Sequence, residues 1–123
     1  MTSRLNHVKL NGTHVSLEDA TVERVYATPM ELVVSVTTWD GIRLRIRVRE
    51  PLEFTYRPSG ELSFVEIATP EELQEPYSRL SIRDEHYGDH SSVDVIRFVG
   101  SDDSVIVCAI SPRGSEPVFE IDR

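Results

Sequence analysis

The sequence is poor in cysteine, in aromatic residues and in long apolar runs, and each shortage excludes a class of protein. A single cysteine among 123 residues rules out an intrachain disulfide and any metal or redox site built on a cysteine pair. Aromatic residues make up 7% of the chain, and only Trp39 lies near a basic segment, which argues against a single-strand nucleic-acid groove. No apolar stretch approaches the roughly 20 residues that span a membrane, and no N-terminal segment resembles a signal peptide. We therefore expect a cytoplasmic protein that does not cross a membrane.

Common catalytic motifs are missing as well. The chain has no glycine-rich phosphate loop and no Gly-x-Ser-x-Gly nucleophile elbow. Cys108 lies in an apolar run at residues 105–110, where a thiol is usually a small buried side chain and not a nucleophile. We expect no catalytic residue from these patterns, and no cofactor.

Charge is distributed unevenly along the chain. The net charge is −8, from 13 Lys or Arg against 21 Asp or Glu. Residues 1–50 carry seven basic and six acidic side chains, a net charge of +1, whereas residues 51–123 carry six and fifteen, a net charge of −9. An acidic field disfavours nonspecific binding to nucleic acid and favours basic proteins as partners.

The pattern of short apolar segments predicts a mainly β protein. About eight strands, separated by turn residues, indicate one antiparallel domain over residues 1–123, folded as a sandwich or as a curled, barrel-like sheet. One short helix is predicted near residues 70–80. Thr69 is its candidate N-cap, Pro70 suits the first helical position, and Glu72 completes a capping box.

Two turns allow the strand register to be predicted. Asn11 and Gly12 favour a tight two-residue turn that places Val8 opposite Val15. A three-residue loop at residues 39–41, ending in a left-handed glycine, makes the numbers of opposed residues sum to 80. This register gathers the apolar side chains on one face, with Leu32 opposite Val48, Val34 opposite Ile46, and Val36 opposite Leu44. A slip by one residue would expose the whole apolar set.

The remaining strands are predicted from alternation and from Pro and Gly positions. The first hairpin begins with a strand at residues 4–10, and a further strand covers residues 21–28. Residues 52–56 and 61–67 form a strand and its return strand around a turn at 57–60. Residues 93–99 and 104–110 form a long hairpin whose second strand is apolar on both faces, and residues 117–121 add a short edge strand.

A ladder of four arginines, Arg43, Arg45, Arg47 and Arg49, is the first candidate binding site. Successive strand side chains point to opposite sides, so the four guanidinium groups share one face, with Trp39 at the adjoining turn. Guanidinium groups bind carboxylates and phosphates through paired hydrogen bonds, which favours an anion or acidic-surface site. The alternative is neutralisation within the sheet. Candidate partners are Glu31 opposite Arg49, and Glu53, Glu61 or Glu66 on a neighbouring strand.

Residues 84–90 contain the best candidate metal site. Asp84, His86, Asp89 and His90 are ligand types that suit zinc or another divalent ion. On a helix the two histidines would share a face, but Gly88 and the surrounding polar residues favour a loop. A solvated loop is therefore the competing interpretation.

One stretch of sequence resembles a known family. Leu17-Glu18-Asp19-Ala20-Thr21-Val22-Glu23-Arg24-Val25, followed by Glu31-Leu32-Val33-Val34-Ser35-Val36, resembles the opening of small all-β bacterial immunity proteins of polymorphic toxin systems. In that family a Leu-x-Asp-Ala-like turn leads into a strand, and an acidic residue followed by leucine starts the next strand. Glu18 stands where the family usually has histidine. The resemblance implies a noncatalytic binder that neutralises a partner protein, and it transfers no functional residue.

Three functions follow as hypotheses from different classes. The first is a noncatalytic binding or inhibitor domain whose acidic surface meets a basic partner protein. The second is a metal-dependent enzyme or metal-binding module at residues 84–90. The third is a structural or assembly protein, such as a homodimer, that uses the arginine face of residues 43–49.

Overall fold

The computed structural model describes residues 3–58, 60–69 and 93–122, and within them every regular element is a β-strand. Eleven strands follow one another along the chain. They are β1 (Ser3–Leu5), β2 (His7–Leu10), β3 (Thr13–Ser16), β4 (Thr21–Ala27), β5 (Glu31–Thr37), β6 (Arg43–Arg49), β7 (Glu53–Tyr56), β8 (Leu62–Ala68), β9 (Val93–Gly100), β10 (Val105–Pro112) and β11 (Val118–Ile121). The helix predicted near residues 70–80 lies outside the described residues.

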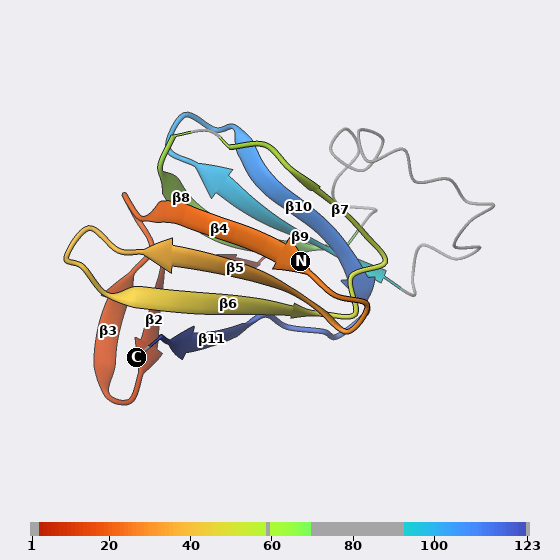
Figure 1. Ribbon diagram of the computed structural model, residues 1–123, viewed down its shortest axis with the longest axis horizontal. Helices are drawn as coiled ribbons and strands as arrows, with labels where there is room; N and C mark the ends of the chain where they lie inside the picture. The colour runs from red at the N-terminus through yellow and green to blue at the C-terminus, as the bar shows by residue number, and fades with distance from the viewer. Residues whose placement is uncertain (1–2, 59, 70–92, 123) are drawn as a thin grey trace.

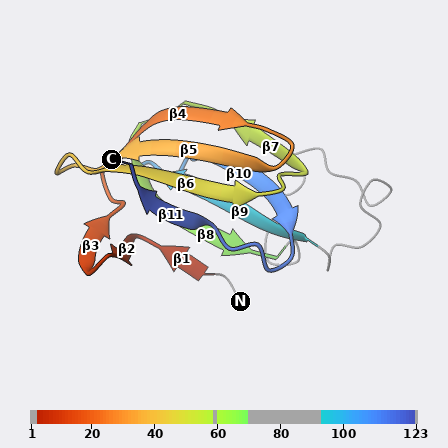
Figure 2. The ribbon, with the colours of Figure 1, turned by 60° about the horizontal axis from the view of Figure 1, so that its bottom comes forward.

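The strands form a β-sandwich. A five-stranded sheet has the order β1-β8-β9-β10-β7, a four-stranded sheet has the order β11-β6-β5-β4, and β2 and β3 form a separate hairpin. The four-stranded sheet lies against the five-stranded one, and β4 and β7 are the edge strands on the same side of the sandwich (Figures 1 and 2). All pairings are antiparallel, as predicted, and the sandwich is the correct one of the two predicted architectures. The described residues form no closed barrel.

The core lies between the two sheets. It is built from the inward apolar side chains of β5 and β6 on one side and of β8, β9 and β10 on the other. Leu32, Val34, Ile46, Ile96 and Phe98 are each fully buried in it. Burial of these apolar side chains is the main source of stability for a domain of this size.

The hairpin of β5 and β6 has the predicted register. Leu32 lies opposite Val48, Val34 opposite Ile46, Val36 opposite Leu44, and Glu31 opposite Arg49. Gly41 adopts a φ of +88°, the left-handed conformation that the loop requires and that glycine reaches without steric cost. The Thr38 hydroxyl accepts a hydrogen bond from the Ile42 N–H at 2.9 Å and donates one to Asp40 at 2.5 Å, which fixes the turn.

The N-terminal hairpin also has the predicted pairing of Val8 with Val15. Asn11 and Gly12 both have positive φ angles, 51° and 82°, as a tight hairpin turn of this type requires. The strand predicted at residues 4–10 is instead two strands. The two strands are separated at Asn6, whose C=O accepts a hydrogen bond from the Leu17 N–H. As a result β1 pairs with β8, while β2 pairs with β3.

The pairing predicted for residues 52–56 and 61–67 is wrong. Both segments are strands, but β7 pairs with β10 and β8 pairs with β9 and β1, so β9 and β10 separate them within one sheet. Burial gives the physical reason. Residues on both faces of β8 are buried, which requires neighbours on both edges, whereas β7 is short and largely exposed and therefore suits an edge.

The C-terminal strands follow the prediction. β9 and β10 form a long hairpin in which Val95 lies opposite Ile110, and most residues of both strands are buried on both faces. β11 is an edge strand, paired with β6. Among the described residues no helix is long and apolar enough to cross a membrane.

The outward face of the five-stranded sheet carries a buried ion pair. Glu66 on β8 is 2% exposed and accepts a hydrogen bond from Arg97 on β9, whose side chain is 14% exposed. Arg4 on β1 lies 3.6 Å from the same carboxylate and stacks over the Phe64 ring at 4.9 Å. An apolar cluster adjoins this pair on the same face and contains Ala68, Val93, Val95, Cys108 and Ile110.

Candidate functional site

The four arginines of β6 lie on the outward face of the four-stranded sheet. Their neighbours are β5 and β11, because Arg47 lies opposite Val33 on one side and Val118 on the other. The acidic partners therefore do not come from residues 52–56 or 61–67, which belong to the other sheet. They come from β5 and from the C-terminal segment, which the sequence did not place beside this strand.

Arg47 forms ion pairs with two glutamates of the same sheet. Its guanidinium group donates hydrogen bonds to Glu31 at 2.5 Å and to Glu120, from strands on either side. The hydrogen bond from Arg47 holds the pKa of Glu120 below its usual value, and the same bond raises the pKa of Arg47. This arginine is neutralised by its neighbours and is a poor anchor for an added anion.

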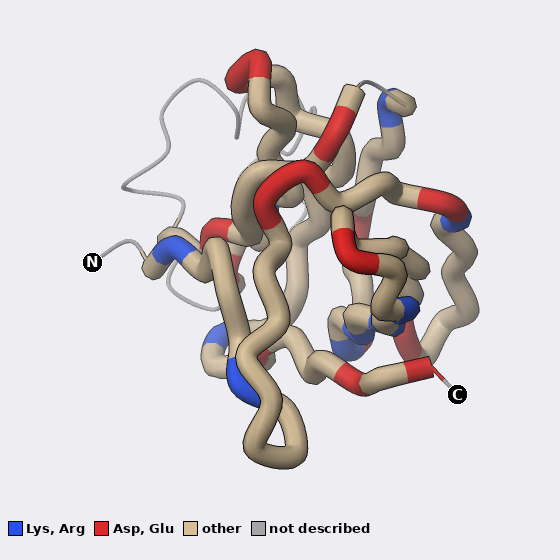
Figure 3. The backbone as a smooth tube through the Cα atoms, turned by 90° about the vertical axis from the view of Figure 1, so that its left-hand side faces the viewer, with Lys and Arg blue, Asp and Glu red and all other residues tan. Residues whose placement is uncertain are grey.

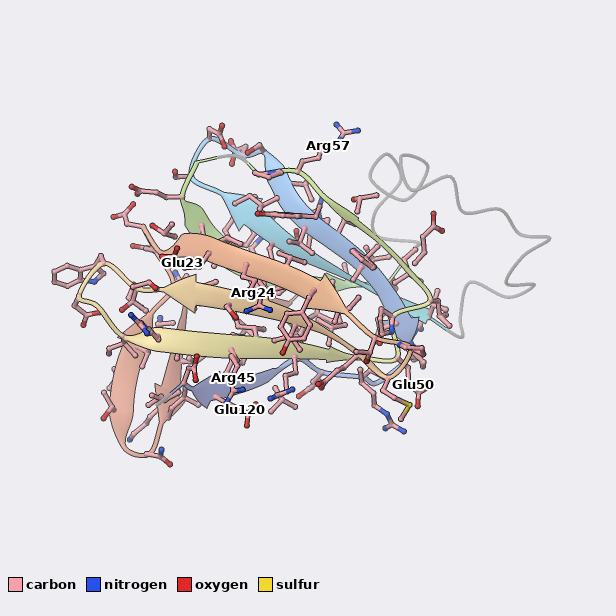
Figure 4. The ribbon with its side chains drawn as sticks, in the orientation of Figure 1. Glu23, Arg24, Arg45, Glu50, Arg57 and Glu120 are labelled. Atoms are coloured by element: carbon pink, nitrogen blue, oxygen red, sulfur yellow. The ribbon has the colours of Figure 1, made fainter. Side chains whose placement is uncertain are left out.

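The other three arginines are held less tightly. Arg45 Nε lies 3.7 Å from Asp122 Oδ1, which is too far for a hydrogen bond, and Arg49 Nε lies 3.4 Å from Glu50 Oε1. Among the described residues Arg43 has no carboxylate within ion-pair distance. The face is therefore largely charge-balanced. Figure 4 shows Arg45 and Glu120 side by side at the border of β6 and β11.

A shallow hollow of about 360 Å³ lies at the Arg43 end of this face. It is lined by Glu23, Arg24, Ser35, Val36, Thr37, Arg43, Leu44 and Asp122. Arg24 is stacked over the Tyr26 ring at 5.2 Å, and Figure 4 shows it over β5. Because two carboxylates stand beside the two arginines, the hollow has no strong preference for an anion.

An acidic surface lies at one end of the sandwich, where the turns β3–β4, β5–β6, β7–β8 and β9–β10 meet. We call it the acidic end and define it by six exposed carboxylates: Glu18, Asp19, Asp40, Glu61, Asp102 and Asp103. Figure 3 looks onto this end and shows acidic segments on several neighbouring turns. The four turns contain one basic residue, Arg57, at the start of the β7–β8 turn. Three of the six residues come from the first 50 positions, although the sequence had indicated that the acidic charge belongs to the C-terminal part.

Main-chain hydrogen bonds hold three of these turns together. The Asp19 N–H donates to Leu62 O at 2.9 Å, and the Leu62 N–H donates to Ala20 O at 2.7 Å. The Ser101 N–H donates to Glu61 O at 2.9 Å, which ties the β9–β10 turn to the same point. Hydrogen bonds from the Ser104 hydroxyl and N–H keep the pKa of Asp102 below its ordinary value. The carboxylates are thus displayed on a fixed frame.

Trp39 stands at the tip of the β5–β6 turn within the acidic end. Its side chain is 71% exposed, the largest exposure of any large apolar residue described. The turn beneath it is fixed by the Thr38 hydrogen bonds and by Gly41. An exposed tryptophan on an ordered turn, beside Asp40, is the type of residue that anchors protein interfaces.

The predicted metal site, Asp84, His86, Asp89 and His90, lies outside the described residues. Within the part of the chain that the structure describes, no group of three or more His, Cys, Asp or Glu side chains is arranged to hold a metal ion. His7 and His14 flank the first hairpin turn with ring centroids 6.3 Å apart. Cys108 is 4% exposed, as predicted, and burial raises the pKa of its thiol to about 12, which makes it a poor nucleophile.

Comparison with known proteins gives no relative. No protein-family model matches the chain, and no significant match was found among curated proteins or among solved structures. The resemblance to immunity proteins therefore stays a prediction from the sequence.

Proposed function

We propose that the protein is a noncatalytic protein-binding domain, of the inhibitor or immunity type, that docks its acidic end on a basic surface of a partner protein. The observation that carries the proposal is that six exposed carboxylates, on four turns, lie at the same end of the sandwich as the exposed Trp39 (Figure 1). A surface of one sign of charge steers an oppositely charged partner, and a tryptophan supplies the apolar contact that slows dissociation.

The arrangement supports this function better than the arginine face does. The four turns of the acidic end contain six carboxylates and one basic residue, Arg57, whereas on the arginine face Arg45, Arg47 and Arg49 each have a carboxylate within 4 Å. Uncompensated charge produces a field that reaches a partner before contact, whereas paired charge does not.

The test compares two variants of equal net charge. Asp19→Asn with Asp103→Asn neutralises the acidic end, and asparagine tolerates the positive φ angles of 62° and 65° at these positions. Glu50→Gln with Glu116→Gln is the matched control away from that end. Each protein is immobilised and used to capture its partner from cells of the source organism, and association rates are then measured at several salt concentrations.

The wild type is expected to lose roughly tenfold or more in association rate between low and high salt. The acidic-end variant should start slower and depend less on salt, while the control should behave as the wild type does. Trp39→Ala should instead raise the dissociation rate, by about 30-fold if Trp39 is an anchor worth about 2 kcal/mol. An association rate that is independent of salt, or that falls equally in both double variants, would contradict the proposal.

A further inference from the structure

β7 is an edge strand of the five-stranded sheet. Among the described strands it has a neighbour, β10, on one side only (Figures 1 and 2). The Arg57 N–H donates to Ile106 O at 2.7 Å, so these two residues occupy a hydrogen-bonded position of the ladder. Backbone groups alternate in direction along an antiparallel strand, so those of Thr55 point to β10 and those of Phe54 and Tyr56 point to the open edge. Two N–H and two C=O groups are therefore oriented to pair with an added strand.

The side chains along this edge are apolar and exposed. Leu52, Phe54 and Tyr56 are 47%, 39% and 37% exposed. Phe54 and Tyr56 lie opposite Ala109 and Val107, so they share the core-facing side of the sheet but stand at its rim. Natural proteins usually protect such edges with lysine, proline or a bulge, and none of these occurs within β7.

The sequence of the edge is complementary to itself. If two copies of β7 pair antiparallel with residue numbers that sum to 110, Phe54 of one copy lies opposite Tyr56 of the other, and Thr55 lies on the twofold axis. Glu53 then lies opposite Arg57 of the second copy, on the outward face. Because of the twofold symmetry, the dimer contains two such Glu53–Arg57 pairs. Opposite charges and aromatic residues are favourable cross-strand pairs.

Neighbouring registers lose this complementarity. A sum of 108 or 112 keeps Phe54 and Tyr56 at hydrogen-bonded positions but places Thr55 opposite Glu53 or opposite Arg57. Pro51 and Pro58 bound the segment and lack an N–H, so a longer pairing that slides further along the edge is not available. Of these registers, the one in which opposed residue numbers sum to 110 combines backbone hydrogen bonds at Phe54 and Tyr56 with the aromatic pairs and the Glu53–Arg57 pairs.

From this pattern we infer that the protein forms a twofold dimer in which the β7 edges of two copies pair antiparallel. The two five-stranded sheets then become one continuous sheet of twice five strands, with β7 at its centre. The dimer surface contains none of the six carboxylates of the acidic end and none of the four arginines of β6, although Arg57 lies in the same β7–β8 turn as Glu61. Dimerisation and the proposed partner binding therefore use different side chains.

The first test is the mass in solution over a range of protein concentrations, by analytical ultracentrifugation. The wild type should show a concentration-dependent doubling of its 14.0 kDa mass. Arg57→Glu places like charges opposite Glu53 in both halves of the interface and should weaken the dimer about tenfold or more. Combining Arg57→Glu with Glu53→Arg exchanges the two charges and should restore it.

Arg49→Glu on β6 is the matched control, since it makes the same charge change on an exposed arginine elsewhere. It should leave the dimer unchanged. Circular dichroism with urea unfolding identifies any variant that fails to fold. A wild type that stays monomeric at all concentrations, or a dimer broken by Arg49→Glu and not by Arg57→Glu, would overturn the inference.

A disulfide test reads the register directly and does not depend on charge. Thr55→Cys is made together with Cys108→Ala, because Cys108 lies opposite Thr55 on β10. Opposed residues at a non-hydrogen-bonded position have Cα atoms about 4.5 Å apart, within disulfide range, so oxidation should yield a covalent dimer. Arg57→Cys in the same background is the control, since its two copies would be about 13 Å apart. Equal cross-linking of both variants, or none with Thr55→Cys, would overturn the inference.

Discussion

Replacing Glu66 with alanine is expected to be among the most damaging single changes to the fold. Glu66 is 2% exposed and accepts a hydrogen bond from Arg97, whose side chain is 14% exposed. Without the carboxylate, a largely buried guanidinium group remains without its charge partner, and Arg97 Nε has no hydrogen-bond partner among the described residues even in the wild type. Removing one partner of a buried ion pair lowers the free energy of unfolding by about 3–5 kcal/mol. At roughly 4 °C per kcal/mol, the melting temperature should fall by about 12–20 °C.

Urea unfolding followed by far-UV circular dichroism measures this loss. Tryptophan fluorescence is a poor probe, because Trp39 is 71% exposed in the native turn. Arg49→Ala is the control, since Arg49 is 74% exposed, lies 3.4 Å from Glu50 and should contribute less than about 1 kcal/mol. The double replacement Glu66→Leu with Arg97→Met removes both charges and should recover most of the loss. A loss below about 1 kcal/mol for Glu66→Ala would refute the assignment of a buried ion pair to this face.

Two further predictions concern Cys108 and Gly41. Burial raises the pKa of the Cys108 thiol from 9.0 to about 12, so the contribution of this thiol to stability is complete below about pH 9 and is lost as the pH rises towards 12. The difference in unfolding free energy between wild type and Cys108→Ala should therefore shrink from pH 9 upwards in urea titrations, and a constant difference would contradict it. Gly41 has a φ of +88°, so Gly41→Ala should cost about 1–2 kcal/mol in the same assay. Gly41→Asn should cost less, and equal losses would show that the turn is not constrained in this way.

Local features of the fold could be predicted from the sequence, and distant pairings could not. The turn chemistry of Asn11 with Gly12 and of Gly41 fixes both hairpin registers, because each turn involves only neighbouring residues. By contrast, β7 and β8 are adjacent in sequence but not in the sheet, since their places depend on which strands are apolar enough for the centre. Alternation identified both strands, but it contains no information about which strand is their neighbour.

The candidate sites show the same division. The common face of the four arginines could be predicted from period two. The main partner of Arg47 could not, because Glu120 lies 73 positions away and reaches it through the edge strand β11. The acidic end could not be predicted for a similar reason. Glu18 and Asp102 are far apart in the chain, and their turns lie together because both are hydrogen-bonded to the main chain of Glu61 and Leu62.

The main-chain bonds that join the turns of the acidic end have a consequence for how this protein can change over time. Because N–H and C=O groups hold the frame, the identity of most side chains on the turns is not needed for folding. Substitutions at Glu18 or Glu61 can therefore accumulate with little loss of stability, while each alters the surface that the proposed partner would meet. The scaffold thus permits the proposed recognition surface to diversify while the strands stay the same.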